Sequence, residues 1–404
     1  MHFTLSTAAM RMALKTVVKA IPTRSPLAIL SNMSVRADCS KQRVSIAATD
    51  MHMAVAVALS AQVADDGESL LHHKSVVRSL RGVKASQVTF EFTEGAGKLT
   101  TEGGATGIPV ADPADYPTLP APGFKSSRVY APVLLRLLQQ TMFAAATSDE
   151  SRAMMTGVSL SWDGRKAVAV ATDGKQLAKS EGVLLLPGEA PLGSEYGSPK
   201  GELVIPVRAC RVMADLLLSC ERSTVRMNYC DGTLFLWDED GRFWTSTRLL
   251  QGQFPQWERV LVKNESIRFE GLFHAKHFER AIQSIMPAAQ HESEKDGSLL
   301  VRFSMDGNEC HLAAGTTTGK VNVAGKGIFP CVLAANPEYL LNFIEVAATF
   351  REPFVSWGVQ DDCQAMRFAQ GDEFLWILMP IRLRGAEQQP PKSLRGSRSA
   401  RRVA

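Results

Sequence analysis

The sequence lacks the features that mark membrane-spanning and secreted proteins. Within its 404 residues, no apolar run approaches the roughly 18 residues that a membrane-spanning helix needs. The N-terminal stretch MHFTLSTAAMRMALK also lacks the continuous apolar core of a secretory signal peptide. We therefore expect a cytoplasmic protein.

Cysteine is scarce and scattered. The seven cysteines, at positions 39, 210, 220, 230, 310, 331 and 363, contain no C-x-x-C pair and are odd in number. This pattern favours neither a disulfide framework nor a zinc site. The eight histidines are equally dispersed apart from His72 and His73, and no metalloprotease, P-loop or nucleophile-elbow motif occurs. The sequence thus predicts no metal, no cofactor and no catalytic residue.

Most of the chain also lacks an excess of charge of one sign. The last 21 residues, 384–404, hold six basic side chains and one acidic one and so carry +5, which leaves about −1 for residues 1–383 out of a total of +4. A nearly neutral body is not a general basic surface, so a nucleic-acid interface has to come from local sorting of cations. The tail is rich in Arg, Ser, Pro and Gln, a composition typical of disorder.

What the chain does contain is one module that recurs. In the stretch 151–177, two β-rich runs flank Asp163-Gly164, a typical hairpin turn, and a second polar turn follows at 171–174. The order of strand, helix, strands and polar turn also occurs earlier and later in the chain. The turn threonine follows the opening strand by 46 residues in the first copy and by 43 in the second and third, counted as Phe3 to Thr49, Val129 to Thr172 and Phe273 to Thr316. These offsets indicate an internal triplication.

Each copy is expected to be an α+β domain in which two helices cover one face of a sheet. The expected helices lie at 6–20, 73–82, 131–146, 275–286 and 337–347, with one more after Pro206, and a strand is expected at 28–35. The predicted domains are 1–124, 127–262 and 267–383, followed by the tail 384–404. The Gly- and Pro-rich stretch 186–201 is predicted to be an enlarged loop of the second copy.

Cations gather on the predicted helices. In the first helix Arg11, Lys15 and Lys19 recur every four residues, opposite an apolar face. Three such domains in an arc, with helices on the concave side, would give a positive inner wall suited to a duplex contacted only at its phosphates. Charge sorting alone predicts these DNA contacts: Arg11, Lys15, Lys74, Arg136, Arg211, Lys276 and Arg280.

From Met1 to Leu383 the chain resembles the β sliding clamp of bacterial DNA polymerase III. The stretches that carry the resemblance are RSPLAILSN at 24–32, ATD at 48–50, YP at 116–117, Gly157 with ATDG at 171–174, FP at 254–255 and MPIRL at 379–383. No single stretch is specific, but the set in this order and at these separations is. The resemblance implies a head-to-tail homodimer of three-domain subunits, a six-domain ring that encircles duplex DNA and has no active site.

The resemblance also assigns residues. Matching DNA contacts are Arg24, Arg78, Arg208, Asn336 and Tyr339. The ring interface is expected between an edge of the first domain, with Thr106 and Ile108, and a third-domain helix on which Ile285 and Met286 are expected to be exposed.

The resemblance further implies a cleft between the second and third domains that binds linear peptides of the polymerase III α subunit, the clamp loader and repair polymerases. Its expected floor is Met155, Thr172, Gly174, Leu177, Pro255, Val260, Ile377, Met379, Pro380 and Ile381, and its expected rim is Arg152, Met154, Lys175, Gln176, Arg259 and Arg382. Methionine and leucine in a shallow groove give adaptable apolar contacts for varied peptides.

The sequence departs from the family pattern in three respects. Lys175-Gln176 replaces the more usual His and Arg, Met154 stands where an aromatic residue is common, and the tail continues past the point where family members usually stop. Two other classes of protein remain alternatives. One is a monomeric clamp-derived regulator or decoy, and the other is a nuclease, which would need clustered carboxylates such as 238–240 or 361–362 to hold metal ions.

Overall fold

The computed structural model describes residues 1–93, 95–120, 126–147, 150–189, 200–220, 223–296, 299–330, 332–350, 352–361 and 363–383. The predicted tail 384–404 and most of the predicted loop 186–201 lie outside these residues. The chain forms two compact units, which are described separately. Unit 1 comprises Met1–Leu135, Leu160–Ala167 and Val183–Gln251, and unit 2 comprises Arg136–Ser159, Val168–Gly182 and the chain from Gly252 onward. The three-domain division stays a prediction.

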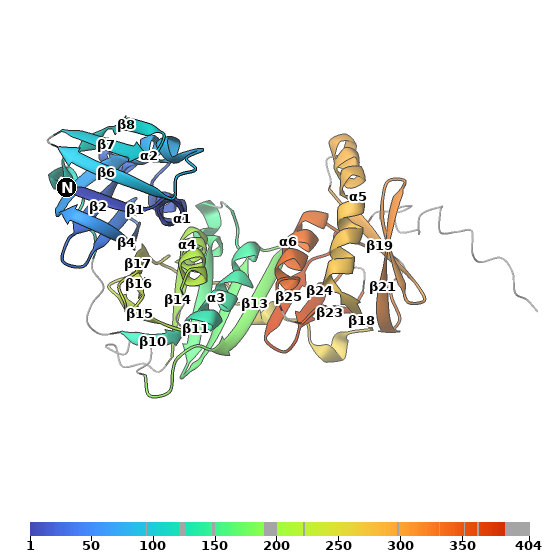
Figure 1. Ribbon diagram of the computed structural model, residues 1–404. Helices are drawn as coiled ribbons and strands as arrows, with labels where there is room; N and C mark the ends of the chain where they lie inside the picture. The colour runs from blue at the N-terminus through green and yellow to red at the C-terminus, as the bar shows by residue number, and fades with distance from the viewer. Residues whose placement is uncertain are drawn as a thin grey trace, which may run out of the picture. The chain divides into compact units, whose positions relative to one another are not determined.

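Unit 1 is built on antiparallel strands with short helices (Figure 1). Its elements in chain order are β1 (His2–Ser6), α1 (Thr7–Val17), η1 (Val18–Ala20), η2 (Ala28–Ser31), β2 (Asn32–Asp38), β3 (Arg43–Thr49), β4 (Met53–Asp65), β5 (Gly67–His72), α2 (His73–Leu80), β6 (Gln87–Thr93), β7 (Ala96–Thr101), β8 (Gly104–Ile108), β9 (Val110–Ala111), η3 (Pro113–Asp115), β10 (Ser127–Tyr130), β14 (Lys200–Pro206), α4 (Val207–Leu218), β15 (Thr224–Cys230), β16 (Thr233–Trp237) and β17 (Phe243–Arg248).

The long strand β4 joins the sheet of unit 1 into one surface. The strand order is β10-β15-β16-β17-β4-β1-β6-β7-β8, with β2, β3, β5 and β9 off this path. The first half of β4 pairs with β17, where Val55 faces Thr245, and its second half pairs with β1, where Val63 faces Phe3. Because β4 has 13 residues, it can pair with three different strands. At the far end of this order β8 pairs only with β7, which makes β8 an edge strand.

Unit 2 contains a second antiparallel sheet with the long helix α5 and the shorter helix α6 (Figure 1). The strands β11 (Gly157–Asp163) and β12 (Lys166–Thr172) and the helix α3 (Ala131–Gln139) run through both units, and β13 ends on the first residue of a unit 1 segment, Val183. The other elements are η4 (Met142–Ala144), η5 (Glu150–Thr156), β13 (Gln176–Val183), η7 (Trp257–Val260), η8 (Asn264–Ser266), β18 (Phe269–His274), α5 (Ala275–Asp296), β19 (Val301–Asp306), β20 (Glu309–Ala314), β21 (Thr317–Gly327), β22 (Leu333–Ala335), α6 (Pro337–Ala347), β23 (Phe354–Val359), β24 (Met366–Gln370) and β25 (Phe374–Leu378). From β13 onward the strand order is β13-β25-β24-β23-β18-β21-β20-β19-β22.

Helix starts follow their capping residues. Ser6 caps α1 by accepting a hydrogen bond from the amide of Ala9, and Asn336 caps α6 by accepting one from the amide of Glu338. In α1 the buried residues Met10, Leu14 and Val17 recur at helical spacing. The predicted helices at 6–20 and 337–347 are therefore present, the first in a slightly shorter form.

Three predicted elements differ from the structure. The helix predicted at 131–146 ends as α3 at Gln139, and the hydroxyl of Thr141 donates to the carbonyl of Leu137 just beyond that end. The helix predicted to end at residue 286 continues to Asp296, because Pro287 lies on an exposed position and removes only one backbone donor. The strand predicted at 28–35 begins only at Asn32, after the turn η2.

Aromatic packing forms the core of unit 2. Phe343 of α6 stacks on Trp376 of β25 with ring centroids 4.4 Å apart, and Phe368 lies 5.0 Å from Trp376. All three side chains are buried. Pairs of this kind add about 0.5–1.5 kcal/mol to the free energy gained from burying their area.

Replacing Phe343 by Ala should lower the free energy of unfolding by about 3–5 kcal/mol, because a large buried ring leaves a cavity. Urea denaturation followed by tryptophan fluorescence and circular dichroism measures this change. Phe354→Ala is the matched control, because Phe354 is 44% exposed and should cost less than about 1 kcal/mol. Equal losses in the two variants would contradict this assignment of the core.

Candidate functional site

The turn between β12 and β13 is held by its own side chains. The hydroxyl of Thr172 donates to the carbonyl of Gln176 (2.6 Å) and accepts from the amide of Gly174 (3.1 Å). The carboxylate of Asp173 accepts from the amides of Lys175 (2.8 Å) and Gln176 (2.9 Å). Gly174 has φ +88°, a left-handed conformation that glycine adopts without strain. Every residue of this turn therefore has a fixed place.

The same turn recurs between β3 and β4. The hydroxyl of Thr49 donates to the carbonyl of Met53 and accepts from the amide of Met51. The carboxylate of Asp50 accepts from the amides of His52 and Met53. Met51 has φ +74° at the position of Gly174. This matching of hydrogen bonds supports the repeat that was predicted from sequence spacing.

The turn of β12 and β13 lies beside the end of β25, two segments that are far apart in the sequence. Leu177 of β13 faces Ile377 of β25, and the amide of Met379 donates to the carbonyl of Lys175 (2.9 Å). The amide of Ile381 donates to the carbonyl of Ala334 (2.7 Å). The sequence prediction that 172–177 and 377–381 come together is thus confirmed by backbone contacts.

Two residues of η5 lie close to glycines, Arg152 to Gly174 of this turn and Met154 to Gly252. A Cβ built on Gly174 would lie 3.0 Å from Nη1 of Arg152, and one built on Gly252 would lie 3.1 Å from the sulfur of Met154. We use the name junction surface for the residues of the predicted cleft, all of which belong to unit 2, namely Arg152, Met154, Met155, Thr172, Gly174, Lys175, Gln176, Leu177, Pro255, Arg259, Val260, Ile377, Met379, Pro380, Ile381 and Arg382. The contacts above join Arg152, the turn at 172–177 and the segment 377–379.

Exposure separates these residues into support and surface. Thr172, Leu177 and Ile377 are buried and support the surface from below, whereas Met379 is 47% and Val260 52% exposed. Exposed cations are Arg152, Lys175, Arg259 and Arg382, and the half-buried residues are Met154, Met155, Pro255, Pro380 and Ile381. The junction surface thus combines accessible apolar side chains with positive charge.

Gln176 does not lie at a rim, contrary to the sequence prediction. Its side chain is buried, because its carbonyl oxygen accepts from Nε1 of Trp376 (3.1 Å) and its amide donates to Asp173. Sequence reasoning missed Asp173 and Trp376 as supports of the turn. The recurrence of Asp after Thr in both turn copies was the available signal for Asp173.

A tyrosine supports each copy of the turn. The hydroxyl of Tyr116 accepts from the amide of Thr49 (3.2 Å) and donates to the carbonyl of Asn32 (3.3 Å). Tyr339 forms a side-chain hydrogen bond with Asp173, and burial followed by the charge of Asp173 raises the pKa of Tyr339 to about 12. Asn336, the second predicted DNA contact on α6, uses its side chain as the helix cap.

The predicted DNA-binding cations of unit 1 are all exposed, but two of them, Arg11 and Arg208, form hydrogen bonds or ion pairs within the protein. The guanidinium of Arg11 donates to the carbonyls of Leu80 and Val83, both at 2.6 Å. That of Arg208 pairs with Asp50 and donates to the carbonyl of Lys19. The remaining exposed cations of this set are Lys15, Arg24, Lys74, Arg78 and Arg211.

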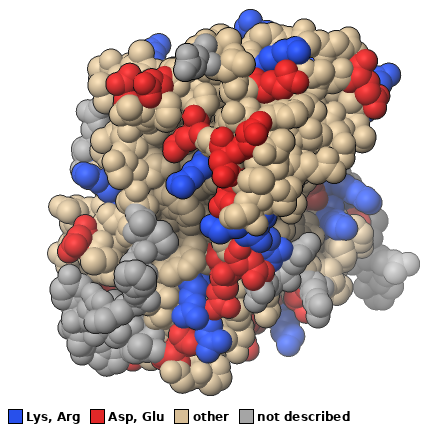
Figure 2. Space-filling model, turned by 60° about the vertical axis from the view of Figure 1, so that its left-hand side comes forward, with Lys and Arg blue, Asp and Glu red and all other residues tan. Residues whose placement is uncertain are grey.

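In unit 2 one of the three predicted DNA-binding cations is not exposed. Arg136 is half-buried, forms an ion pair with Glu373 (2.9 Å) and donates to the carbonyl of Glu181 (3.0 Å). Lys276 and Arg280 on α5 are exposed. On the face drawn in Figure 2, basic and acidic side chains lie in small mixed groups and form no single basic area.

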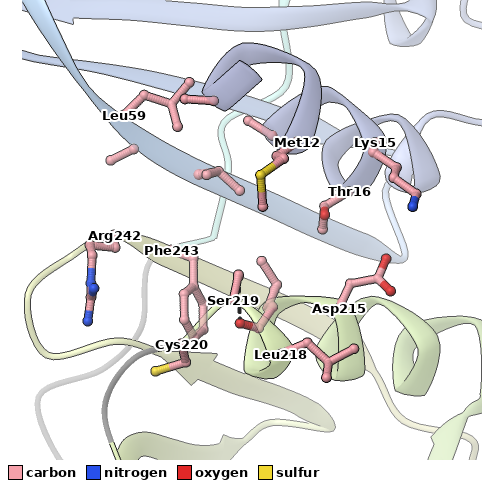
Figure 3. A pocket seen from close by; sticks show the side chains of 15 residues that line it. Met12, Lys15, Thr16, Leu59, Asp215, Leu218, Ser219, Cys220, Arg242 and Phe243 are labelled. Carbon is pink, nitrogen blue, oxygen red and sulfur yellow. Dashed lines mark hydrogen bonds between the residues drawn. The ribbon is translucent and has the colours of Figure 1, made fainter. Parts of the chain in front are cut away.

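A groove of about 600 Å³ lies between α1 and α4 within unit 1 (Figure 3). Met12 points into it from α1, and Leu218 lies opposite on α4. Both side chains are more than 60% exposed, at 65% and 63%. Lys15 and Asp215 flank the groove, and Asp215 is ion-paired with Lys19.

Two of the predicted interface residues are not accessible. Thr106 on the edge strand β8 is exposed, but Ile108 is 3% exposed. Ile285 is fully buried, so the expectation of an exposed side chain was wrong, and Met286 is half-buried. Ile285 shares the buried face of α5 with Ile282 and Ala289, which lie three and four residues away from it.

The carboxylates considered for a nuclease site have structural partners where they are described. Asp238 is buried and accepts from Nε of Arg242 (2.9 Å), and Asp240 lies 3.8 Å from the same guanidinium. Asp361 accepts from the amides of Cys363 and Gln364, and Asp362 lies outside the described residues. Among the described residues, no group of three or more His, Cys, Asp or Glu is placed to hold a metal ion, and no helix is long and apolar enough to cross a membrane.

Comparison with known proteins gives one consistent result. Residues 1–120 match the family model of the N-terminal domain, and residues 128–256 that of the central domain, of the DNA polymerase III beta subunit. The beta sliding clamp of Chlamydia pneumoniae is 24% identical over 397 residues, covering 95% of this chain and 99% of that protein. The beta sliding clamp of Synechococcus elongatus is 24% identical over 335 residues, covering 80% and 82%.

Solved structures share the fold. The DNA polymerase III beta subunit of Thermotoga maritima superposes with a TM-score of 0.77 at 19% identity, covering 95% of this chain and all of that one. The sliding clamp of Bacillus subtilis gives the same TM-score and coverage at 17% identity.

The repeated α+β modules define a protein of the sliding-clamp class, a non-catalytic processivity factor. Residues 1–120 and 128–256 supply the more specific evidence, because both matched models describe one protein family. The chain belongs to the family of the bacterial DNA polymerase III β subunit, the β sliding clamps.

Replacing Met51 by Gly should raise the free energy of unfolding by about 1 kcal/mol, because an L side chain in the left-handed region is strained and Met51 is half exposed. Gly174→Ala should have the opposite sign, because its Cβ would crowd Arg152 in the same turn. Melting temperatures of both variants test this pair. A lower melting temperature for Met51→Gly would contradict the assigned strain.

Proposed function

We propose that this chain is the subunit of a DNA sliding clamp that binds a second copy head to tail, forms a six-domain ring around duplex DNA and tethers DNA polymerases through the junction surface. Family membership and the matched fold support the clamp assignment. The ring has no substrate to transform. Processivity comes from topology, because a closed ring leaves DNA only by opening.

The observation that carries the tethering role is the pairing of Lys175 with Met379. That backbone contact fixes an exposed methionine beside a rigid turn. A flexible thioether on a rigid support can follow the shape of different apolar side chains. The surrounding cations favour peptides with carboxylates beside their apolar residues. We propose linear motifs of the polymerase III α subunit, the clamp loader and repair polymerases as the partners.

The proposed DNA contacts are the exposed cations without a structural contact described above: Lys15, Arg24, Lys74, Arg78, Arg211, Lys276 and Arg280. Lysine and arginine contacts to phosphates carry no sequence information, so the ring can slide. Arg11, Arg208 and Arg136 are better explained as structural residues, because their guanidinium groups donate to backbone carbonyls.

In the proposed ring, unit 1 contributes the edge strand β8 to the interface with the second copy. Its outer edge has backbone groups without a strand partner in the sheet order of unit 1. Such an edge is a ready template for pairing with a second chain. The proposed contacts on the partner are from α5 and its neighbouring strands, with Met286 in place of the buried Ile285.

Met379→Ala should weaken binding of a polymerase-derived peptide about tenfold, since truncating a central apolar contact typically costs over 1 kcal/mol. Fluorescence anisotropy of a labelled peptide measures the affinity. Met12→Ala is the matched control, because Met12 is an exposed methionine of unit 1. Unchanged affinity in Met379→Ala would reject the junction surface as the peptide site. Leu177 is less suitable, because it is buried and its loss would also destabilise the fold.

Because the proposed ring contains two chains, we expect a native mass near twice 44.0 kDa at low micromolar concentration. Light scattering measures this mass directly. A mass near that of one chain would favour the alternative, a monomeric clamp-derived regulator or decoy.

Thr106→Pro should lower the dimer fraction, since proline within the edge strand removes a backbone donor from pairing.

A further inference from the structure

A second pocket of unit 1 concentrates groups that can carry positive charge. It has a volume of about 560 Å³ and lies between the loop from Ile21 to Ala28 and the start of α2. Its lining includes Arg24, His72, His73 and Lys74, and none of the described residues that line it is acidic. The histidine pair His72-His73 has no part in the function proposed above.

The backbone at the start of α2 adds donors to this pocket. The first amides of a helix have no partner within the helix and are often capped by a side chain. The cap residue of α2, His72, provides no such side-chain bond, and the first turn contains no acidic residue. The positive end of the helix dipole therefore adds to the charge of Lys74.

Hydrogen bonds orient the two imidazole rings. Nδ1 of His73 lies 2.6 Å from the carbonyl oxygen of Ser31, so this nitrogen donates and leaves Nε2 as the basic atom. Nδ1 of His72 lies 3.1 Å from the hydroxyl of Ser75, and the ring centroids are 5.4 Å apart. The contact with Ser75 involves Nδ1 of His72 and leaves its Nε2 for a ligand or a proton.

The charged groups around the pair are mostly positive. Burial, followed by the charges of His73, Lys74 and Arg78, lowers the pKa of His72 from its ordinary value of 6.5. From the neighbouring elements, Lys19 follows Val18 in η1, and Arg208 of α4 donates to the carbonyls of Lys19 and Ile21. The carboxylates reached through these contacts, Asp215 and Asp50, are ion-paired with Lys19 and Arg208.

We propose that this pocket binds a phosphate group and that His72, beside His73, takes up a proton when it does, so that the affinity for a DNA backbone rises as pH falls. The inference rests on the proposed function, because DNA is the source of phosphate that a clamp meets. A phosphodiester does not titrate between pH 6 and 8, so any change in affinity over this range comes from the protein.

The direction of the pH effect follows from the linkage between proton uptake and phosphate binding. In the empty pocket burial, followed by repulsion from neighbouring cations, lowers the pKa of His72 and favours its neutral form. A bound anion favours the charged ring and raises its pKa, so binding takes up a proton in the window between the two values. The affinity should increase by about three- to tenfold as pH falls from about 8 to about 6, for one proton taken up.

The first test measures the affinity of the full chain for a rhodamine-labelled duplex by anisotropy across this pH range at constant ionic strength. The double variant His72→Gln, His73→Gln should keep binding through Arg24 and Lys74 but lose the dependence on pH. His291→Gln is the matched control, because His291 is exposed on α5 in unit 2. The same slope in the double variant and the unchanged chain would overturn the proposal.

The second test uses nuclear magnetic resonance of the histidine rings, with His72 and His73 assigned by the single variants. A pKa of His72 that rises on adding duplex supports the proposal, and one that rises only with inorganic phosphate overturns the link to DNA while identifying a free-phosphate site. Duplex binding with unshifted pKa values overturns the inference and leaves the proposed function standing. Failure of the duplex to bind at any pH would instead count against both.

Discussion

The hydrogen-bonded turn from Thr172 to Gln176 is the constraint on which the junction surface depends. One hydroxyl and one carboxylate satisfy the backbone of this turn, and the first residue of β13 is thereby fixed. The start of β13 sets its register with β25, and that register places Met379 against Lys175. A shift of one residue would turn Leu177 from the buried face to the exposed face. The hydrogen bonds of this turn therefore determine where the exposed apolar side chain of Met379 lies.

Structural and binding roles compete for the same arginines. Arg11, Arg136 and Arg208 each reach backbone carbonyls or carboxylates, and these contacts join helices to neighbouring segments within their own unit. An exposed ion pair contributes at most about 1 kcal/mol, but a guanidinium with two or three acceptors is also held in one orientation. Such a group gains less from a passing phosphate than a free lysine does. In the proposed function, the weak and mobile phosphate contacts that sliding requires are therefore assigned to exposed lysines such as Lys15 and Lys74.

Sequence reasoning predicted what depends on local pattern. The helix starts at Ser6 and Asn336, the hairpin at Asp163-Gly164 and the repeated Thr-Asp turn all follow from residue types at fixed spacings. The errors concern long-range packing. Whether Ile285 faces outward depends on strands that pack against α5, and whether Gln176 is buried depends on Trp376, 200 residues away. Neither partner is visible in the local sequence.

The two supporting tyrosines show how a repeat can diverge while its geometry persists. Tyr116 holds the first turn through the amide of Thr49, and Tyr339 holds the second through the carboxylate of Asp173. The atoms contacted differ, yet each phenol fixes the same short turn. The first copy tolerates Met51 at positive φ, because five hydrogen bonds hold the backbone around it. The second copy uses glycine there and admits Arg152 close to the backbone. A cation reaches both turns, since Arg208 pairs with the carboxylate of Asp50 in the first copy and Arg152 lies against Gly174 in the second. The second copy combines its cation with the exposed Met379, which directly follows β25.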